Sequence, residues 1–527
     1  MNADKRRRFD SYPGSGLTRP SMQDSGELIE IVAVDVSQGA VRVSAERPPS
    51  VIVLAAGGGT RMKSAIPKML HEICGRPLLG HVLTAVKALR PESLVVVVGH
   101  GRDHVGPYVE QAEPDAVLAV QEEQLGTGHA VQVGLASVPQ LTGTVVVTTG
   151  DTPLLTTDTL RALAAQHDED GHAVTVLTGV VEDASGYGRV VRDREGQVAR
   201  IVEHRDATPA QRAITEFNSS IYAFDADFLR EALSMLHPDN DQAELYLTDV
   251  VEIARNMHRT VGAHHIEDVW QTEGVNDRIQ LARLGAEMNR RILDAHMRAG
   301  VTVVDPASTW IDVAVSLEPD TTLLPGVHLQ GATSVASGAM IGPDTTLVDV
   351  TVGAGARIVR THGSGSVVGP ASIVGPFAYL RPGTRLGARG KIGTFVEVKN
   401  SEIGDGSKVP HLSYIGDTTI GEQTNIGAGS ITANYDGEAK HRTTIGSHCH
   451  TGSDNVFVAP VEVGDGAVTG AGTVVRRDVP PGALAVSTGP QRHLDDWVAR
   501  KRPGTPGDEA ANRAKAADGS AIEGTVQ

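Results

Sequence analysis

A hexapeptide repeat in the second half of the chain constrains its fold more than any other feature. Beyond residue 300, an aliphatic residue followed by glycine recurs with a spacing near six. The pairs begin at Ile341, Val352, Leu386, Ile392, Ile403, Ile415, Ile420, Ile426, Ile445, Val463 and, with threonine in the aliphatic place, Thr469. In a parallel β-helix, three short strands make a coil of about 18 residues, and the apolar residue of each strand points inward. The repeat therefore predicts a β-helix, with a glycine-rich sandwich or a disordered repeat as the weaker alternatives.

The repeat is interrupted in three places, at residues 362–366, 411–413 and 434–442. Insertions in solenoid proteins tend to form loops on one face, and that face often binds ligands. We expect the interruptions to form loops and to hold the functional residues of this half.

The segment between residues 51 and 275 has the alternating pattern of an α/β domain. Apolar β-type runs at residues 94–98, 145–148, 174–177 and 221–224 alternate with helical patterns, such as those at residues 78–89 and 159–167. This alternation predicts an α/β layer with a mainly parallel sheet. Open sheets of this kind bind ligands at the carboxyl ends of their strands.

A glycine-rich loop follows the first of these strands, in the sequence LAAGGGTRM at residues 54–62. Glycines let backbone N–H groups approach an anion closely, and Arg61, Lys63 and Lys68 add positive charge. The loop lacks the GxxxxGK[ST] pattern of a Walker A motif, and Met62 stands where a dinucleotide fingerprint needs its third glycine. It predicts a polyphosphate-binding loop, with an ordinary strand-to-helix turn as the alternative.

Two further strand ends carry polar residues. Asp151 follows the strand at 145–148 and could hold Mg²⁺ against a phosphate, although a lone aspartate in a turn is more often structural. Gln121 and the turn QLGTGH at residues 124–129 offer amide and hydroxyl partners for a base or a ribose. Three such turns in one α/β unit favour a nucleotide-binding site.

Composition limits the remaining classes of function. The chain has 527 residues and a formal net charge of -17, which argues against a broad nucleic-acid-binding surface. Its two cysteines do not indicate a disulfide framework, and no apolar run approaches the roughly 20 residues of a membrane span. We expect a cytoplasmic protein that acts on small molecules.

The chain is expected to divide into five segments. Residues 1–48 and 495–527 read as disordered tails, because charged and small residues dominate them without periodicity. Domains are expected at 49–276 and 301–494. The connector at 277–300 contains an amphipathic helix over residues 278–298, with an apolar stripe of Leu281, Leu284, Met288, Ile292 and Ala295.

Across residues 50–490 the chain resembles one family, the bifunctional bacterial N-acetylglucosamine-1-phosphate uridylyltransferase/glucosamine-1-phosphate N-acetyltransferases. The resemblance rests on motifs in family order: LAAGGGTRM at 54–62, PK at 67–68, QLGTGHA at 124–130, GD at 150–151, GYGR at 186–189, EH at 203–204, EGVN at 273–276 and NYDG at 434–437. It implies an α/β, Rossmann-like nucleotidyltransferase domain followed by a left-handed parallel β-helix of hexapeptide repeats.

For the first half, the resemblance implies uridylyl transfer from UTP to N-acetylglucosamine 1-phosphate, which gives UDP-N-acetylglucosamine and pyrophosphate. The implied nucleotide-binding residues are Leu54, Ala55, Ala56, Gly57, Arg61, Lys68, Gln121, Gly126, Thr127, Thr149, Gly150 and Asp151. The implied sugar-binding residues are Gly188, Glu203, Asn218 and Asn276. Asp151 and Asn276 would hold Mg²⁺.

For the second half, the resemblance implies acetyl transfer from acetyl-CoA to glucosamine 1-phosphate. His411 would be the general base, a role that suits imidazole because it titrates near neutral pH. The sugar phosphate would be bound by Arg381, Lys399, Tyr414, Asn425 and Lys440. Acetyl-CoA would be bound by Ala428, Asn434, Tyr435, Ser453 and Ala471.

The resemblance also implies a homotrimer in which neighbouring subunits form the acetyltransfer pocket. The product would supply the precursor of cell-wall peptidoglycan and of lipopolysaccharide. Thr488 is a departure from the family, because some relatives carry there an arginine that contacts coenzyme A.

Two other classes of function stay open. One is a single-activity sugar nucleotidyltransferase whose β-helix is only structural, and the joint presence of His411, Tyr414, Asn425 and Lys440 argues against it. The other is a non-catalytic trimeric scaffold that keeps the nucleotide fold as a binding module. Asp151 and Asn276 argue against that one.

Overall fold

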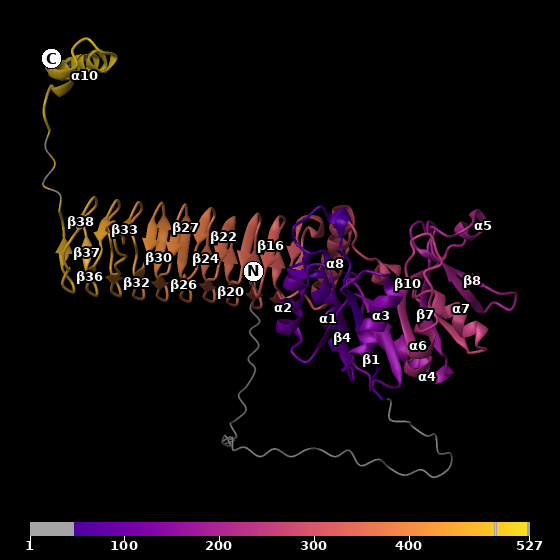
Figure 1. Ribbon diagram of the computed structural model, residues 1–527. Helices are drawn as coiled ribbons and strands as arrows, with labels where there is room; N and C mark the ends of the chain where they lie inside the picture. Colours follow the sequence, from indigo (N-terminus) through magenta and orange to yellow (C-terminus); the bar gives the residue numbers. More distant parts are fainter. Residues whose placement is uncertain (1–46, 488, 490, 492, 524–527) are drawn as a thin grey trace, which may run out of the picture. The chain divides into compact units, whose positions relative to one another are not determined.

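The computed structural model describes residues 47–487, 489, 491 and 493–523 (Figure 1). Residues 1–46, which make up most of the expected N-terminal tail, and Thr488 lie outside the described residues. Within the described part of the chain, no helix is long and apolar enough to cross a membrane.

The first half is built on a nine-stranded sheet in the described chain. The strand order is β11-β7-β10-β6-β1-β4-β5, and β8 and β9 attach beside β10. On the main path β10 runs antiparallel to its neighbours, and the other pairings are parallel, which confirms a mainly parallel sheet. The strands are β1 (Ser50–Ala55), β4 (Leu94–Val98), β5 (Val117–Val120), β6 (Thr144–Thr149), β7 (Val174–Val180), β8 (Gly188–Arg192), β9 (Val198–Val202), β10 (Glu216–Asp225) and β11 (Val261–His265).

Helices cover both faces of this sheet because its central strands are apolar on both sides. Side chains alternate across a strand, so Val51 and Val53 of β1 face one layer and Ile52 faces the other. The first layer contains α1 (Leu78–Lys87), α2 (Arg102–Ala112) and α4 (Thr157–Asp170). The second contains α3 (Thr127–Ala136), α6 (Ala226–Leu233) and α7 (Asp249–Asn256).

Short elements complete this half. Two 3-10 turns, η1 (Thr60–Met62) and η2 (Lys68–Leu70), follow the glycine loop, and the hairpin β2 (Glu72–Ile73) and β3 (Arg76–Pro77) comes next. Helix α5 (Pro209–Arg212) and the turn η3 (Val269–Thr272) lie further along the chain.

The order of the strands reverses at β1. From β1 the chain continues to β4 and β5 on one side, and it then returns to β6 on the other side. Open α/β sheets bind ligands outside the carboxyl ends of their strands at such a point. Leu54 of β1 aligns with Thr149 of β6, so the glycine loop and the turn that holds Asp151 leave the sheet side by side.

Helix α8 (Arg278–Arg298) joins the two halves, with the bounds that the sequence predicted. Its N-cap is Asp277, whose carboxylate accepts hydrogen bonds from the N–H groups of Ile279 and Gln280. Leu293 is buried in the core of the β-helix, whereas Ala295, expected on the buried stripe, is exposed. The partner of the stripe changes along the helix: Leu284 packs with Ile73 of the first half, whereas the helix contacts the β-helix half from Asn289 onward.

The second half is a parallel β-helix, as the repeat predicted. All of its strand pairings in the described residues are parallel. The repeat residues are buried, from Ile341 at 0% exposure to Thr469 at 3%. They form the core of the coil together with Leu293 of α8.

Each coil contributes strands to three sheets, here called sheets one, two and three. Sheet one contains β12 (Thr302–Val303), β15 (Thr322–Leu323), β18 (Met340–Ile341), β21 (Arg357–Ile358), β24 (Ile373–Val374), β27 (Lys391–Thr394) and β30 (Lys408–His411), with β37 (Val468–Thr469) and β39 (Leu484–Ala485) paired further on. Sheet two contains β13 (Trp310–Ile311), β16 (Val327–Gln330), β19 (Thr345–Val348), β22 (Thr361–Ser364), β25 (Ala378–Leu380), β28 (Glu397–Lys399), β31 (Tyr414–Gly416), β33 (Ile431–Ala433), β35 (Val456–Val458) and β38 (Val474–Val475). Sheet three contains β14 (Ser316–Leu317), β17 (Ser334–Val335), β20 (Thr351–Val352), β23 (Val367–Val368), β26 (Arg385–Leu386), β29 (Glu402–Ile403), β32 (Thr418–Ile420), β34 (Thr443–Ile445) and β36 (Val461–Val463). The turn η4 (Pro306–Ser308) lies between β12 and β13.

The interruptions of the repeat behave differently from one another. Residues 434–442 form a loop between β33 and β34, as expected. Residues 362–366 and 411–413 do not form loops, because they lie in regular coils. At the second place Leu412 alone turns the corner from β30 to β31, with a φ of 49°. One residue in the left-handed conformation is enough for that corner, so no insertion is needed.

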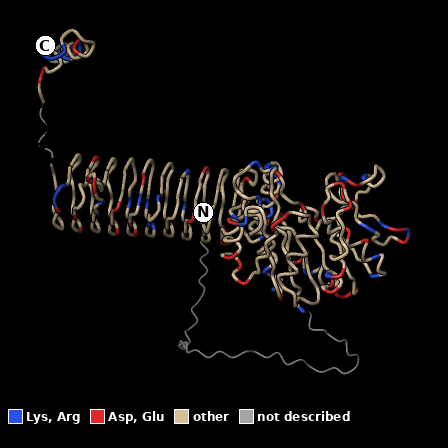
Figure 2. The backbone as a smooth tube through the Cα atoms, in the orientation of Figure 1, with Lys and Arg blue, Asp and Glu red and all other residues tan. Residues whose placement is uncertain are grey.

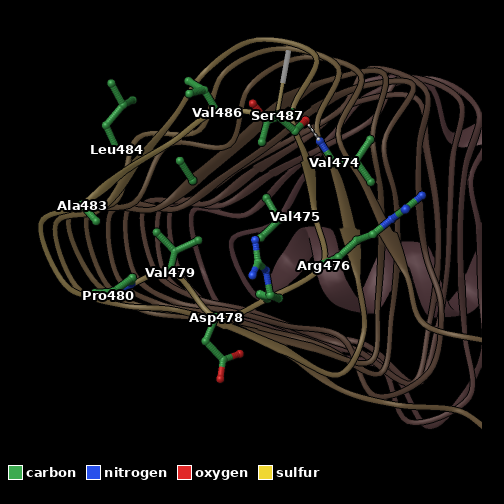
Figure 3. A pocket seen from close by; sticks show the side chains of 13 residues that line it. Val474, Val475, Arg476, Asp478, Val479, Pro480, Ala483, Leu484, Val486 and Ser487 are labelled. Atoms are coloured by element: carbon green, nitrogen blue, oxygen red, sulfur yellow. Dashed lines mark hydrogen bonds between the residues drawn. The ribbon is translucent and has the colours of Figure 1, made fainter. Parts of the chain in front are cut away.

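In the described residues, the last coil of the β-helix leaves its end open. Figure 3 shows Val475 and Val479 pointing into the coil and Asp478 and Leu484 pointing away from it. Leu484 is 66% exposed, whereas Val475 is 3% exposed.

The C-terminal segment contains regular structure, so the expectation of a disordered tail at residues 495–527 is wrong for most of it. Helix α9 (Trp497–Lys501) and helix α10 (Pro506–Glu523) lie in this segment. The segment is rich in alanine with glutamate, lysine and arginine, which are strong helix formers.

Candidate functional site

A cavity of about 280 Å³ lies at the carboxyl ends of β1 and β6, where the strand order reverses. Its lining consists of Leu54, Ala56, Gly57, Lys68, Met69, Gln121, Gln124, Gly126, Thr127, Ala130, Thr149, Asp151 and Glu244. Most of the expected nucleotide-binding residues are therefore brought together. Ala55 and Gly150 lie buried behind the lining, and the Gly150 N–H donates to the Leu54 carbonyl at 2.9 Å.

Lys68 and Asp151 form an ion pair at this cavity. The Lys68 Nζ lies 2.5 Å from Asp151 Oδ2, and the two side chains are only 10% and 13% exposed. Gly59 makes room for the lysine, because a Cβ at that position would lie 2.6 Å from the Lys68 Cβ. Gly59 also has a φ of 60°, which side chains disfavour. The glycine loop thus closes over Lys68 and holds its charge at the end of β6.

Asn276 reaches the same place from the segment before α8. The Val275 N–H donates to the Asp151 carbonyl at 3.0 Å, which fixes this segment beside the turn after β6. Arg61 is exposed, and its Nη2 donates to Asn276 Oδ1 at 3.0 Å. Arg61 therefore joins the group from outside the lining of the cavity.

The donor set of Asp151 and Asn276 fits Mg²⁺. Mg²⁺ prefers oxygen ligands, and it usually takes one or two carboxylates and completes its shell with water and substrate phosphates. A carboxylate and an amide oxygen beside a phosphate-binding loop match this pattern. The described residues contain no group of three or more His, Cys, Asp or Glu side chains suited to a metal, so the protein by itself would not fill the shell.

Three of the four expected sugar-binding residues, Gly188, Glu203 and Asn218, form a second group, whereas Asn276 lies beside Asp151. Gly188 of β8 pairs with Asn218 of β10, and a Cβ at Gly188 would lie 3.5 Å from Glu203 Oε1. Burial raises the pKa of the Glu203 carboxyl above its ordinary value, and nearby carboxylates, Glu244 among them, add to this shift. Asn218 is buried, and its Nδ2 donates to the Tyr222 hydroxyl at 2.8 Å. The group offers acceptors and a carboxyl group that could bind sugar hydroxyls.

Four cavity residues were not among the predicted site residues: Met69, Gln124, Ala130 and Glu244. Gln124 begins the QLGTGH turn, which the sequence analysis named as a source of amide and hydroxyl partners, and its Nε2 donates to the Ala56 carbonyl at 2.7 Å. Glu244 has no such signal. It reaches the cavity because the Leu245 N–H donates to the Leu125 carbonyl at 2.8 Å and draws its segment to the turn.

In the β-helix, His411 lies in a column of residues at the corner between sheets one and two. It is exposed at the end of β30, and the column continues with Ala428, Ser453 and Ala471. Backbone hydrogen bonds connect successive members of this column. The residue that follows each member donates its N–H to the carbonyl of the member in the previous coil. These bonds run from Gly429 to His411 at 3.2 Å, from Asp454 to Ala428 at 2.7 Å and from Gly472 to Ser453 at 2.8 Å. The expected base and these three acetyl-CoA residues thus share one corner.

The corner between sheets two and three carries a second group, organised around Asp417. Asp417 is 5% exposed, and it accepts hydrogen bonds from Asn400 Nδ2 at 2.6 Å, from Lys399 Nζ at 3.2 Å and from Asn434 Nδ2. Burial acts to raise the pKa of Asp417, but these hydrogen bonds outweigh it and hold the pKa below its ordinary value. Asp417 was missed by the sequence analysis, although it lies only six residues after His411.

Two more of the expected cationic and aromatic residues lie on sheet two. The Arg381 Nη1 donates to Glu397 Oε1 at 2.9 Å. Tyr414 lies on the next strand of the same sheet, opposite Glu397. A Cβ at Gly416 would lie 2.4 Å from the Tyr414 hydroxyl, so the ring extends along the strand over the glycine.

The loop at 434–442 leaves from this second corner. Tyr435 is 60% exposed and Lys440 is exposed, and the two form a β-bridge across the loop. Asp436 braces it by accepting from the N–H groups of Glu438 and Ala439. Asn425 lies apart, on sheet one beside Lys408.

Most of the expected acetyltransferase residues of a single chain thus divide between two corners of the prism, whereas Arg381 and Tyr414 lie on sheet two and Asn425 on sheet one. Lys and Arg are interspersed with Asp and Glu over both halves, so the cations of each site act locally (Figure 2). A pocket that needs both His411 and Lys440 must combine residues from different corners.

Comparisons show which known proteins this chain is similar to. A model described as the MobA-like NTP transferase domain matches residues 51–219. "Bifunctional protein GlmU" of Mycolicibacterium vanbaalenii is 60% identical over 464 residues, which are 87% of this chain and 94% of that protein. "Bifunctional protein GlmU" of Streptomyces coelicolor is 58% identical over 480 residues, which are 90% of this chain and 100% of that protein. A solved UDP-glucose pyrophosphorylase complexed with UDP-glucose is 16% identical, with a TM-score of 0.37, and covers 46% of this chain and 99% of its own.

Proposed function

This chain belongs to the family of bifunctional GlmU proteins, and we propose from that membership which residues carry each of its two reactions. It is a bifunctional transferase of UDP-N-acetylglucosamine biosynthesis. It combines a nucleotidyltransferase half with a left-handed parallel β-helix. We assign uridylyl transfer to residues 49–276 and acetyl transfer to residues 301–494, with 277–300 as the connector.

The ion pair of Lys68 and Asp151 at the switch point is the observation that carries the first assignment. An oxygen of the N-acetylglucosamine 1-phosphate phosphate attacks the α-phosphorus of UTP. The bond from that phosphorus to its bridging oxygen breaks, and pyrophosphate leaves. Lys68 and Arg61 pair with phosphate oxygens, because phosphoryl-type transfer needs positioning and neutralisation of charge more than covalent help.

The other residues of this half position the two substrates. Gln121, Gly126 and Thr127 hold the uridine, and the backbone from Leu54 to Gly57 and from Thr149 to Gly150 holds the nucleotide at the ends of β1 and β6. Gly188, Glu203 and Asn218 receive the sugar. Asp151 and Asn276 hold Mg²⁺, which when bound neutralises charge on the phosphate oxygens.

For acetyl transfer, His411 takes the proton from the amine of glucosamine 1-phosphate. The amine nitrogen attacks the thioester carbonyl carbon of acetyl-CoA and the C–S bond breaks. Coenzyme A leaves as its thiolate, which receives from His411 the proton that the amine lost. Arg381, Lys399 and Lys440 pair with the sugar phosphate, and Tyr414 and Asn425 complete its pocket. The column of Ala428, Ser453 and Ala471 lines the acetyl-CoA groove, with Asn434 and Tyr435 beside it.

We propose that the chain acts as a homotrimer. His411 and Lys440 lie at different corners of one prism, so a neighbouring chain would complete each acetyltransfer pocket. An apolar ladder at the corner between sheets one and two supports this proposal. Phe377, Phe395 and Leu412 are 50%, 59% and 64% exposed, and the two phenylalanine rings stack with centroids 5.4 Å apart. Light scattering on the purified chain should give three times the chain mass, and an acetyl-transferring monomer would contradict the proposal.

One experiment tests both activities together. The purified chain is incubated with glucosamine 1-phosphate, acetyl-CoA, UTP and Mg²⁺, and the products are identified by mass spectrometry. UDP-N-acetylglucosamine is the expected product. If the product forms only when N-acetylglucosamine 1-phosphate is supplied, the chain lacks acetyl transfer and the β-helix has only a structural role. Because UTP and acetyl-CoA are cytoplasmic metabolites, we also propose that the enzyme works in the cytoplasm.

A further inference from the structure

The amide group of Gln121 is held in one orientation. Gln121 follows β5, is 5% exposed, and lines the cavity at the switch point. Its Nε2 lies 3.2 Å from the Gly126 carbonyl oxygen and 3.1 Å from His129 Nδ1. A carbonyl oxygen can only accept a hydrogen bond, so the NH₂ end of the amide must face Gly126. The second N–H of that NH₂ group then donates to His129 Nδ1.

This orientation leaves one polar atom of the amide for a ligand. Both N–H groups are used, and Gln121 Oε1 accepts no hydrogen bond from the described residues. Some polar atoms of the described residues are both buried and without a hydrogen-bond partner, and Gln121 Oε1 is not one of them. The amide therefore presents a pure acceptor to the cavity.

The two groups that orient the amide are themselves held in place. Gly126 has a φ of 107°, and a Cβ there would lie 2.6 Å from the Leu245 carbonyl oxygen, so only glycine fits this turn. The preceding residue ties the turn in place, because the Leu125 carbonyl accepts from the Leu245 N–H at 2.8 Å. His129 lies in the first turn of α3, next to Gly128, whose N–H donates to the Leu245 carbonyl at 2.8 Å. His129 Nδ1 can accept only if the ring is neutral with its proton on Nε2.

We propose that His129 is a positioning residue that holds the Gln121 carbonyl oxygen toward the nucleotide base, and that the site thereby selects uracil over cytosine. The inference rests on the proposed uridylyl transfer. Uracil carries an N3–H donor, which matches the Gln121 oxygen, whereas the N3 of cytosine is an acceptor and opposes it. Without the His129 acceptor the amide can rotate, and its NH₂ end can then meet the cytosine N3.

The test compares UTP with CTP in three variants. In His129→Leu the acceptor is lost, and the ratio of kcat/KM for UTP to that for CTP should fall about tenfold or more, mainly through a higher KM for UTP. In His129→Asn an amide oxygen can take the place of Nδ1, and the ratio should stay near the wild-type value. Gln132→Leu is the matched control, because Gln132 is on the same helix and its Nε2 donates to the Leu233 carbonyl, outside the cavity lining.

Two outcomes would overturn the inference: an unchanged ratio in folded His129→Leu, or an equal fall in all three variants, which would indicate helix packing alone. Circular dichroism checks that each variant folds, and His129→Asn keeps the test valid if His129→Leu does not. Calorimetric titration with UTP and CTP measures selection without turnover. If the wild-type chain prefers UTP in titration and His129→Leu loses that preference, but no product forms, the proposed function is contradicted and the positioning role remains supported.

Discussion

Lys68 Nζ and Asp151 Oδ2 lie 2.5 Å apart, although the two residues are separated by 83 positions in the sequence. Lys68 belongs to η2 after the glycine loop, and Asp151 belongs to the turn after β6. The contact therefore crosses the point at which the strand order of the sheet reverses. The contact places a cation and a carboxylate at the cavity before any ligand binds. The side chains therefore need less rearrangement when a phosphate ligand binds.

Asp151→Asn should lower uridylyl transfer by about 10²- to 10³-fold, because it removes a pre-placed charge from the reacting phosphates. Acetyl transfer should stay within twofold of wild type, since it occurs in the other half. Separate assays of the two reactions measure this. Asp158→Asn is the control, because the Asp158 side chain is 92% exposed on α4. Unchanged magnesium-dependent uridylyl transfer in Asp151→Asn would contradict the proposal that Asp151 is a metal ligand.

Removal of divalent metal should separate the two activities. In the proposed mechanism Asp151 and Asn276 would supply oxygen ligands to Mg²⁺ beside the phosphate loop, whereas the proposed acetyltransfer step uses His411 and cationic side chains. Excess EDTA should therefore stop uridylyl transfer, and added Mg²⁺ should restore it. Acetyl transfer should continue at its original rate. Uridylyl transfer that persists after exhaustive chelation contradicts the metal proposal.

His411→Ala should lower acetyl transfer by about 10²- to 10⁴-fold, the range expected for loss of a general base. Uridylyl transfer supplied with N-acetylglucosamine 1-phosphate should be unchanged. A thiol-release assay and a pyrophosphate assay report the two rates. His328→Ala serves as the control, since His328 is an exposed histidine on an early coil of sheet two. Loss of both activities in His411→Ala would contradict independent sites.

Asp417→Asn should weaken binding of glucosamine 1-phosphate, because the carboxylate that holds Lys399 and Asn434 is lost. We expect a higher KM for the sugar phosphate, a smaller change in kcat, and a loss of about 1–3 kcal/mol in stability from the disturbed buried hydrogen bonds. In the double variant with Lys399→Ala, the KM effects should not add. Asp349→Asn removes a similar carboxylate, which accepts from the Ala332 N–H at 2.8 Å in an earlier coil. Asp349→Asn should lower the melting temperature without changing KM. If Asp349→Asn raises KM as much as Asp417→Asn does, the role of Asp417 is structural only.

Asp249→Asn should stabilise the first half at alkaline pH. Burial, with Glu252 and Asp206 nearby, raises the pKa of Asp249 from 3.8 to about 6. A raised carboxyl pKa means that the folded state binds the proton more tightly, so wild-type stability falls as pH rises from about 4 to about 6. The variant lacks this loss and should be more stable by about 1–2 kcal/mol at pH 8, after allowance for partial exposure of the group and for its favourable place at the start of α7.

Thermal unfolding of both chains from pH 4 to pH 8, followed in the first transition, checks this expectation. The difference in melting temperature should be near zero at pH 4 and constant above about pH 7. The same difference at every pH would show that the substitution acts through packing and not through titration.

Much of the fold could be predicted because its signals are local. The hexapeptide repeat identified residues that are now buried in the coil, such as Ile392 and Ile415 at 0% exposure. Helix α8 has the predicted bounds because an aspartate N-cap and a sustained apolar stripe mark it in the chain itself. The C-terminal helices were missed, because a segment that is polar and rich in alanine reads alike as a helix or as a tail.

The candidate site was predicted only in part. Motifs named Lys68, Gln121 and Asp151, and the structure brings all three to one cavity. Glu244 and Asp417 were missed, since their roles come from contacts with residues that no local pattern links to them. The interruption at 411–413 was misread as a loop, because a corner made by one residue with positive φ looks like an irregularity in the repeat.

The sequence by itself determined the two kinds of architecture, the place where they join, and the polar residues at the strand ends. Periodicity and capping depend on near neighbours in the chain, so they can be read without coordinates. Only the tertiary structure decided that Lys68 pairs with Asp151, that His129 orients the Gln121 amide, and that His411 and Lys440 lie at different corners of the prism. These relations depend on strand order, register and the turn at each corner, which bring distant residues together and are set by the packing of the whole core.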